Sequence, residues 1–164
     1  QTSSAVELSV DGKDVISLWN LGLHTSCPRV KKLELNYPQE ENVSSGIISM
    51  ACSPFHHLTH LHFKRALPFP PSTTTLNDPV SFCDAVKTSC PQLTKLSFTY
   101  ITLKNVDAAK IIQLMKTHPH LADIELDWCS TNADLDPLVS EVNSEGKVTV
   151  TVEHGGVRSG YDEL

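Results

Sequence analysis

The sequence lacks the motifs that mark common catalytic and nucleotide-binding sites. It has only 7 glycines among 164 residues, and neither a P-loop nor a glycine-rich dinucleotide fingerprint occurs. It contains no G-x-S-x-G or H-E-x-x-H motif, and no spacing of serine, histidine and aspartate singles out a catalytic triad. We therefore expect a protein that is not an enzyme and that needs no cofactor.

Long hydrophobic runs and an excess of basic residues are absent as well. No apolar run is long enough to span a bilayer, and Gln1–Ser4 has neither the positive charge nor the apolar segment of a signal peptide. The 13 lysines and arginines against 19 aspartates and glutamates give a formal net charge of −6. A nucleic-acid-binding surface would need a basic stripe for phosphate. We expect neither a membrane nor a nucleic acid as a partner.

Paired cysteines are not expected either. The five cysteines are an odd number and match no zinc-binding spacing such as a paired C-x-x-C. We expect free, buried thiols that pack as small apolar side chains. Such thiols are typical of a reducing compartment, so we expect a cytoplasmic protein. The five are Cys27, Cys52, Cys83, Cys90 and Cys129.

What the sequence does contain is a repeated pattern of apolar residues. In Leu93–Phe98, two polar residues separate the first apolar position from the second, and one separates the second from the third. The central residues Leu33 and Leu61 are 28 residues apart (61 − 33), as are Leu96 and Ile124 (124 − 96), with 35 residues (96 − 61) between the two pairs. Weaker copies flank the series at both ends. The other clear copies are Val30–Leu35, Leu58–Phe63 and Leu121–Leu126.

With Cys129 three residues after Leu126, the last copy completes the pattern L-x-x-L-x-L-x-x-N/C and resembles the leucine-rich repeat. The long period resembles the ribonuclease-inhibitor type, because the family spans about 20–29 residues per repeat. The Cys27-Pro28 and Cys90-Pro91 openings are similar to the cysteine-containing subtype found in F-box proteins.

The resemblance implies an α/β fold. We expect a right-handed solenoid of about six repeats, a horseshoe fragment with a parallel sheet on the concave side and helices on the convex side. It would form a single domain over residues 1–164, with 155–164 as a frayed tail. The chain has no initiator methionine, so we expect it to be part of a longer protein.

Helical patterns lie between the predicted strands. One helix is expected from Val15 to about Ser26, with Val15, Leu18 and Leu21 facing inward and Trp19 as a further candidate for this stripe. Asp78-Pro79 should begin another, with aspartate as N-cap and proline in the first helical position. Its inward residues should be Val80, Cys83 and Val86.

Strand side chains alternate between two faces, so every second residue of each strand should point outward. In the predicted register Lys95 lies beside Asp123, and Glu34 lies beside His62. The outward rows are Lys32, Glu34 and Asn36, then His60, His62 and Lys64, then Lys95, Ser97 and Thr99, and finally Asp123, Glu125 and Asp127.

The outward acidic residues Asp123, Glu125 and Asp127 are candidates for binding a basic partner peptide. The alternative is a solvated face that Lys95 partly neutralises. The candidate protein-binding residues are Asp123, Glu125, Asp127, Lys95, His60, His62, Lys64, Leu67 and Phe69.

Two other features of this sequence could take part in binding. His60 and His62, with Glu34 nearby, could contribute zinc ligands, but no fourth ligand is evident and we expect no metal site. The proline-rich insertion around 66–77 carries the apolar residues Leu67 and Phe69. Insertions in repeats often mark the binding side, although a mobile loop is the alternative.

These observations favour protein–protein recognition without chemistry. The repeat length and the unpaired cysteines resemble the C-terminal region of NOD-like innate immune receptors, which implies ligand sensing or autoinhibition. The substrate-recognition repeats of an F-box ubiquitin ligase are one alternative, and a secreted binding repeat is another. An apolar end face on a terminal repeat would also permit self-association.

Overall fold

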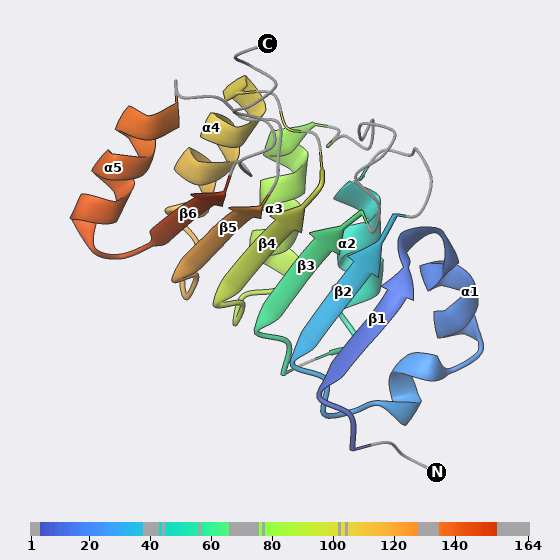
Figure 1. Cartoon of the computed structure of the whole chain (residues 1–164). Coiled ribbons are helices and arrows are strands. Elements are labelled where there is room, and N and C mark those ends of the chain that lie inside the picture. Colours follow the sequence, from blue (N-terminus) through green and yellow to red (C-terminus); the bar gives the residue numbers. More distant parts are fainter. Residues whose placement is uncertain are drawn as a thin grey trace.

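The computed structural model describes residues 4–37, 43, 45–55, 57–65, 76, 78–101, 103, 105–127 and 135–153. In these residues six strands form one parallel sheet, and each strand pairs with the next strand along the chain (Figure 1). The strands are β1 Glu7–Asp11, β2 Lys32–Asn36, β3 His60–Lys64, β4 Lys95–Thr99, β5 Asp123–Asp127 and β6 Thr149–Glu153. The predicted α/β class and the parallel sheet are confirmed.

The helices lie on one side of the sheet (Figure 1). They are α1 Val15–Asn20, α2 Ser45–Cys52, α3 Pro79–Ser89, α4 Asn105–Met115 and α5 Asp136–Glu145, with the 3-10 turns η1 Gly12–Asp14 and η2 Leu23–Ser26. The start of α3 is as predicted, because the Asp78 side chain accepts a hydrogen bond from the Ser81 backbone N–H (3.3 Å) and Pro79 follows it. This cap satisfies one of the N–H groups that a helix start leaves unpaired.

The core lies between the sheet and the helices. Burial alternates along β2, β3 and β5, as expected for strands with one covered face. In the paired register the covered residues form two rows that run across the sheet. One row contains Leu8, Leu33, Leu61, Leu96, Ile124 and Val150, and the other contains Val10, Leu35, Phe63, Phe98, Leu126 and Val152.

Three fully buried aromatic rings join the sheet to α3. Phe63 and Phe98 are stacked, with ring centroids 5.5 Å apart and planes 18° apart. Phe82 meets Phe63 edge-on at 5.3 Å and Phe98 at 5.8 Å. The cluster therefore holds α3 against β3 and β4. Stacked and edge-on ring pairs are also favourable because aromatic rings have negative faces and positive edges.

The helix predicted from Val15 to Ser26 is wrong in its length. α1 ends at Asn20, and Gly22 follows with φ +85°, a left-handed conformation that stops the helix and favours glycine. Leu21 consequently does not face inward and is 83% exposed.

The inward position predicted for Val80 is also wrong. Phe82, Cys83 and Val86 are the buried residues of α3, and Val80 is 43% exposed. Val80 lies in the first turn of the helix, on a side away from the sheet, and Phe82 fills the core there instead.

Four cysteines lie in the described part of the chain, and all four are free and buried. Burial raises the pKa of the Cys83 thiol to about 12, which keeps it protonated and inert. Cys129, the insertion residues Leu67 and Phe69, and the tail 155–164 lie outside the described residues. No helix in the described part of the chain is long and apolar enough to cross a membrane.

Candidate binding face of the sheet

The strand side chains that point away from the helices form one polar surface, here called the open face. No described helix covers it (Figure 1). Its three rows are Glu7, Lys32, His60, Lys95, Asp123 and Thr149, then Ser9, Glu34, His62, Ser97, Glu125 and Thr151, then Asp11, Asn36, Lys64, Thr99, Asp127 and Glu153. All the predicted site residues on β3, β4 and β5 therefore share this face.

The predicted strand register is confirmed at both tested positions. Lys95 pairs with Asp123 along β4 and β5, and Glu34 pairs with His62 along β2 and β3. Because a one-residue slip would move every side chain to the other face, this agreement also assigns the surface residues correctly.

One chain of polar contacts crosses the face from β1 to β4. Asn36 Nδ2 donates to Ser9 Oγ (2.6 Å), and Ser9 Oγ donates to Glu34 Oε2 (2.9 Å). The other carboxylate oxygen of Glu34 lies 3.3 Å from His62 Nδ1, and His62 Nε2 is 2.8 Å from Thr99 Oγ1. These contacts hold the side chains of four strands in defined positions.

A second chain of contacts runs from β3 to β5. Ser97 Oγ donates to Glu125 Oε1 (3.0 Å), so His60 Nε2 is the donor in its 2.8 Å contact with Ser97 Oγ. Lys95 Nζ lies 3.1 Å from Glu125 Oε2. The ion pair of Lys95 is therefore with Glu125, diagonally across the register, and not with its direct neighbour Asp123.

His60 and His62 connect the two chains. Their rings are stacked with centroids 5.8 Å apart and planes 10° apart. Burial, with the positive charges of Lys32, His62 and Lys95, lowers the pKa of His60 to about 4, against a smaller opposing effect of Glu125. Burial also lowers the pKa of His62, although Glu34 opposes the shift. Both rings are therefore neutral at neutral pH.

We expect the free energy of unfolding to fall as the pH is lowered from 6.5 towards 4. The folded pKa of His60 lies below its ordinary value of 6.5, so the unfolded chain binds more protons in this window. The contribution of neutral His60 is complete above pH 6.5 and is lost as the pH falls through the folded pKa. The shift in the pKa of His60 would by itself change the free energy of unfolding by ~3 kcal/mol. Because the side chain is partly exposed, we expect a change of about 1 kcal/mol. Urea titrations at several pH values would measure it.

The variant His60→Gln should flatten this pH dependence, and the exposed His57→Gln serves as the control. If His60→Gln and the wild type lose stability equally between pH 6.5 and 5, the burial of His60 does not control this pH response.

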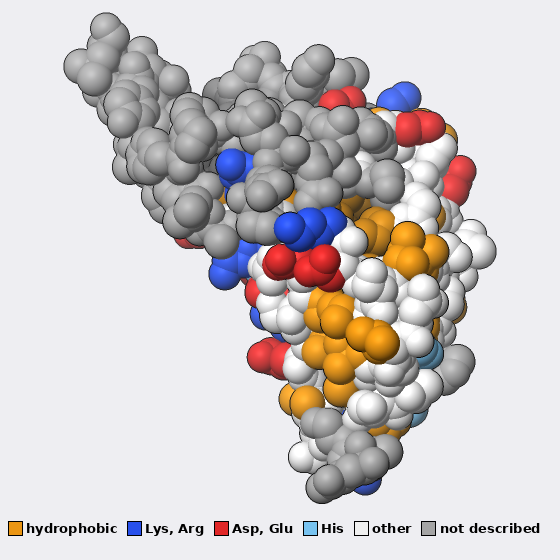
Figure 2. All heavy atoms as spheres, turned by 90° about the vertical axis from the view of Figure 1, so that its right-hand side faces the viewer, with side chains coloured by type: hydrophobic (Ala, Val, Ile, Leu, Met, Phe, Trp, Pro, Cys, Tyr) orange, Lys and Arg blue, Asp and Glu red, His pale blue; other side chains and the backbone are white. Residues whose placement is uncertain are grey.

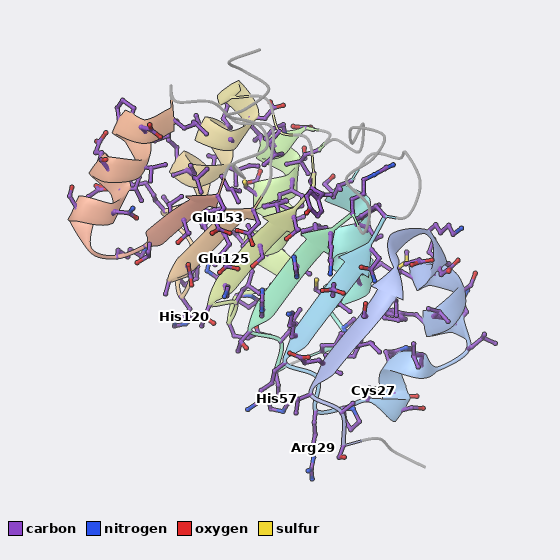
Figure 3. The ribbon with its side chains drawn as sticks, viewed as in Figure 1. Cys27, Arg29, His57, His120, Glu125 and Glu153 are labelled. Atoms are coloured by element: carbon purple, nitrogen blue, oxygen red, sulfur yellow. The ribbon has the colours of Figure 1, made fainter. Side chains whose placement is uncertain are left out.

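Acidic residues gather where β5 and β6 meet. Burial, then the charges of Glu125 and Glu153, raises the pKa of Asp127. Glu125 differs: burial alone would raise its pKa, but hydrogen bonds from Lys95 and Ser97 outweigh this and lower it. Glu125 and Glu153 both lie on the open face (Figure 3). The sequence pattern does not single out Glu153, because the repeat pattern is weak at the last strand.

The histidines do not form a metal centre in the described residues, where no group of three or more His, Cys, Asp or Glu side chains could hold a metal ion. Glu34, His62 and Thr99 follow the order carboxylate, imidazole, hydroxyl that activates a nucleophile. Acyl transfer also needs donors for an oxyanion, but the backbone N–H of Tyr100, next to Thr99, already donates to the Asp127 carbonyl (3.1 Å). The contacts position these three side chains across β2, β3 and β4.

No known family model matches this chain, and no curated protein matches it either.

Proposed function

We propose that the protein is a non-catalytic protein-binding module of the leucine-rich repeat type, a right-handed solenoid that binds through its concave sheet. The observation that carries the proposal is the in-register parallel sheet with its uncovered polar face. The spacing of 28 residues corresponds to one strand and one helix per repeat. Solenoids of this kind use their extended inner surface for recognition.

A basic segment of a partner protein is the ligand that this surface favours. Asp127 and Glu153 are direct neighbours in the register, and the pKa of Asp127 is raised in part by the charges of Glu125 and Glu153. A lysine or arginine placed here would relieve that repulsion, so electrostatic complementarity favours a basic partner. His60, His62 and Lys64 would contact the part of the partner that continues across β3.

We place this module in the cytoplasm, as the ligand-sensing or autoinhibitory repeats of an innate immune receptor of the NOD-like type. The free, buried cysteines support an intracellular setting over a secreted repeat, which would be expected to carry disulfides. The substrate arm of an F-box ubiquitin ligase is the second candidate, favoured by the buried Cys27 and Cys90 in their cysteine–proline openings.

Neutralising the acidic part of the open face should weaken binding of a basic peptide by about 10-fold or more. The variant combines Asp123→Asn, Asp127→Asn and Glu153→Gln, and keeps Glu125 because that residue holds Lys95 and Ser97. Fluorescence anisotropy with a labelled peptide of alternating lysine and serine would measure the dissociation constant at low and physiological salt.

The matched control removes the same amount of charge from the helices, through Asp84→Asn, Asp136→Asn and Glu141→Gln. All three side chains are exposed, and we expect less than about a 2-fold change in affinity. If both triple variants lose affinity equally, the peptide responds to net charge alone and the open face is not the site.

A further inference from the structure

The C-terminal end of the sheet is closed by a side chain. The Thr149 N–H donates to the Ala122 carbonyl of the β5 segment (2.9 Å), so the backbone of the next residue, Val150, is directed away from β5. Asn143 Nδ2 donates to the Val150 carbonyl (3.1 Å), and the Val150 N–H donates to Asn143 Oδ1 (2.6 Å). The Asn143 amide thus takes the place of a further strand.

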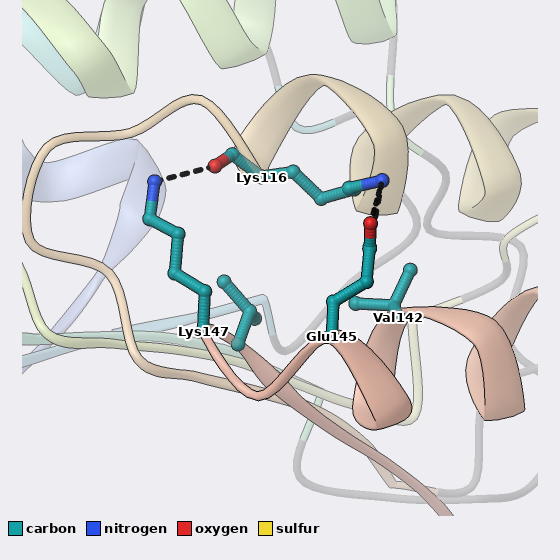
Figure 4. A pocket seen from close by; sticks show the side chains of 5 residues that line it. Lys116, Val142, Glu145 and Lys147 are labelled. Carbon is teal, nitrogen blue, oxygen red and sulfur yellow. Dashed lines mark hydrogen bonds and ion pairs between the residues drawn. The ribbon is translucent and has the colours of Figure 1, made fainter.

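Polar contacts complete this closed end. Lys147 Nζ donates to the carbonyls of Lys116 (2.7 Å) and His118 (3.1 Å). Lys116 Nζ pairs with Glu145 at 2.9 Å, beside a small hollow lined by Val142 (Figure 4). In the described part of the chain, the exposed large apolar side chains lie elsewhere, none of them on α5 or β6.

The N-terminal end has the opposite character. β1 is an edge strand whose one described neighbour is β2. Val6, Ile16 and Leu21 are 49%, 56% and 83% exposed, and Leu8 is only partly buried. Figure 2 views the molecule from this end and shows hydrophobic side chains gathered there. Among the described residues no side chain closes β1 in the way that Asn143 closes β6.

Within the part of the chain that the structure describes, β1 also has backbone groups that are directed away from β2. The Val6 carbonyl accepts from Lys31 and Lys32, and alternate residues of a parallel strand bond to opposite sides. Glu7 and Ser9 therefore direct their N–H and C=O groups away from β2. β1, with the sequence ELSVD, has neither the lysine nor the proline that often protects an edge strand, and its two charged residues stand at its two ends.

We propose that the N-terminal end is a stacking surface for one further leucine-rich strand–helix repeat, an inference that rests on the proposed repeat architecture. The incoming strand pairs in parallel with β1 and places apolar residues against Leu8 and Val10. It places a basic residue beside the exposed Glu7, and its helix covers Ile16 and Leu21. The chemistry required is that of the repeats already in the sheet, since Lys95, Leu96 and Phe98 have these positions in β4.

A second copy of this chain fits the surface less well. Antiparallel pairing of two β1 strands about Ser9 would place Glu7 opposite Asp11 of the other copy, and like charges directly opposite are destabilising. Head-to-tail stacking would bring β6 to β1, but Asn143 already occupies the free backbone groups of Val150.

The test is a chain in which a copy of residues 93–122 replaces residues 1–6. The copy's last residue then precedes Glu7 as Ala122 precedes Asp123, so the added Lys95, Leu96 and Phe98 counterparts come beside Glu7, Leu8 and Val10. We expect the backbone amides of Glu7 and Ser9 to exchange with deuterium about 100-fold more slowly, and the melting temperature to rise by about 5 °C or more.

The control carries the same fusion with Leu96→Asp and Phe98→Asp in the added copy only, and it should show neither change. If the amides of Glu7 and Ser9 exchange equally fast with and without the intact copy, the proposal is overturned.

In case the fusion does not fold, a second variant tests the unfused chain. Ile16→Lys with Leu21→Lys should halve the fluorescence of a bound hydrophobic dye without lowering the melting temperature. Unchanged dye binding would contradict an accessible apolar end.

Light scattering on the unfused chain should report a monomer, and a dimer that Leu21→Lys dissociates would assign the surface to a second copy instead. None of these readouts involves the basic peptide, so a failure here leaves the binding function of the open face independently testable.

Discussion

Replacing Phe98 with alanine should lower the free energy of unfolding by about 4 kcal/mol. The ring is fully buried and contacts both Phe63 and Phe82. Its loss removes the buried apolar area of a phenylalanine and leaves a cavity that the surrounding strands cannot fill, because they are held in register on both sides of β4. It also removes two of the three ring contacts in the cluster, and one of these two attaches α3 to the sheet. Urea denaturation with a common m value would measure the change.

Two further substitutions separate packing from local effects. Phe98→Leu keeps most of the apolar volume and should cost about 1.5 kcal/mol, whereas Val80→Ala, at an exposed site on α3, should cost less than about 0.5 kcal/mol. A cost below 1.5 kcal/mol for Phe98→Ala, equal to that of the leucine variant, would mean that the aromatic cluster is not closely packed.

The strand register was accessible from the sequence because each repeat carries the same spacing of apolar residues. Aligning Leu33, Leu61, Leu96 and Ile124 is sufficient to place their polar neighbours side by side, and the pairs Lys95 with Asp123 and Glu34 with His62 follow from it. In a stacked parallel sheet, the spacing of residues along the chain therefore predicts which side chains are neighbours on the surface, even when the structures of the loops are unknown.

The contacts within that surface could not be read in the same way. Lys95 reaches across to Glu125, and Ser97, although it points away from the helices, is only 1% exposed because His60 and Glu125 close over it. Which neighbour a long side chain chooses depends on rotamers and on competing hydrogen bonds, and strand alternation carries no information about either.

The helices were harder to predict than the strands for a related reason. Short helices between strands have few residues with which to define an apolar stripe, so the phase of α3 could not be distinguished between Val80 and Phe82. Gly22 could have indicated the end of α1, since glycine is the residue most common just after a helix. Asn143 illustrates a further limit: its role in closing β6 depends on two backbone contacts that no motif encodes.

His118→Ala should lower the free energy of unfolding by about 3 kcal/mol. The ring is fully buried. Its Nε2 donates to the Cys90 carbonyl (2.8 Å), and its Nδ1 accepts from the backbone N–H groups of His120 and Leu121 (3.1 Å each). Alanine would leave these three backbone groups without the ring as a partner, and the contacts of Cys90 and Leu121 that are lost are buried. Burial lowers the pKa of His118, as is required for a ring whose Nδ1 must stay unprotonated to accept.

Two conservative variants can divide this contribution between the loop and the neighbouring repeat. His118→Asn keeps an acceptor near the Nδ1 position but cannot reach Cys90, and His118→Gln can reach Cys90 but lacks the nearby acceptor. Each should retain part of the stability, about 1–2 kcal/mol better than alanine, and the exposed His120→Ala should be close to neutral. If His118→Ala unfolds at the same urea concentration as His120→Ala, the ring does not connect the two consecutive loops. If only the asparagine variant recovers stability, the histidine acts within its own loop, and adjacent repeats are held together by the sheet and the core alone.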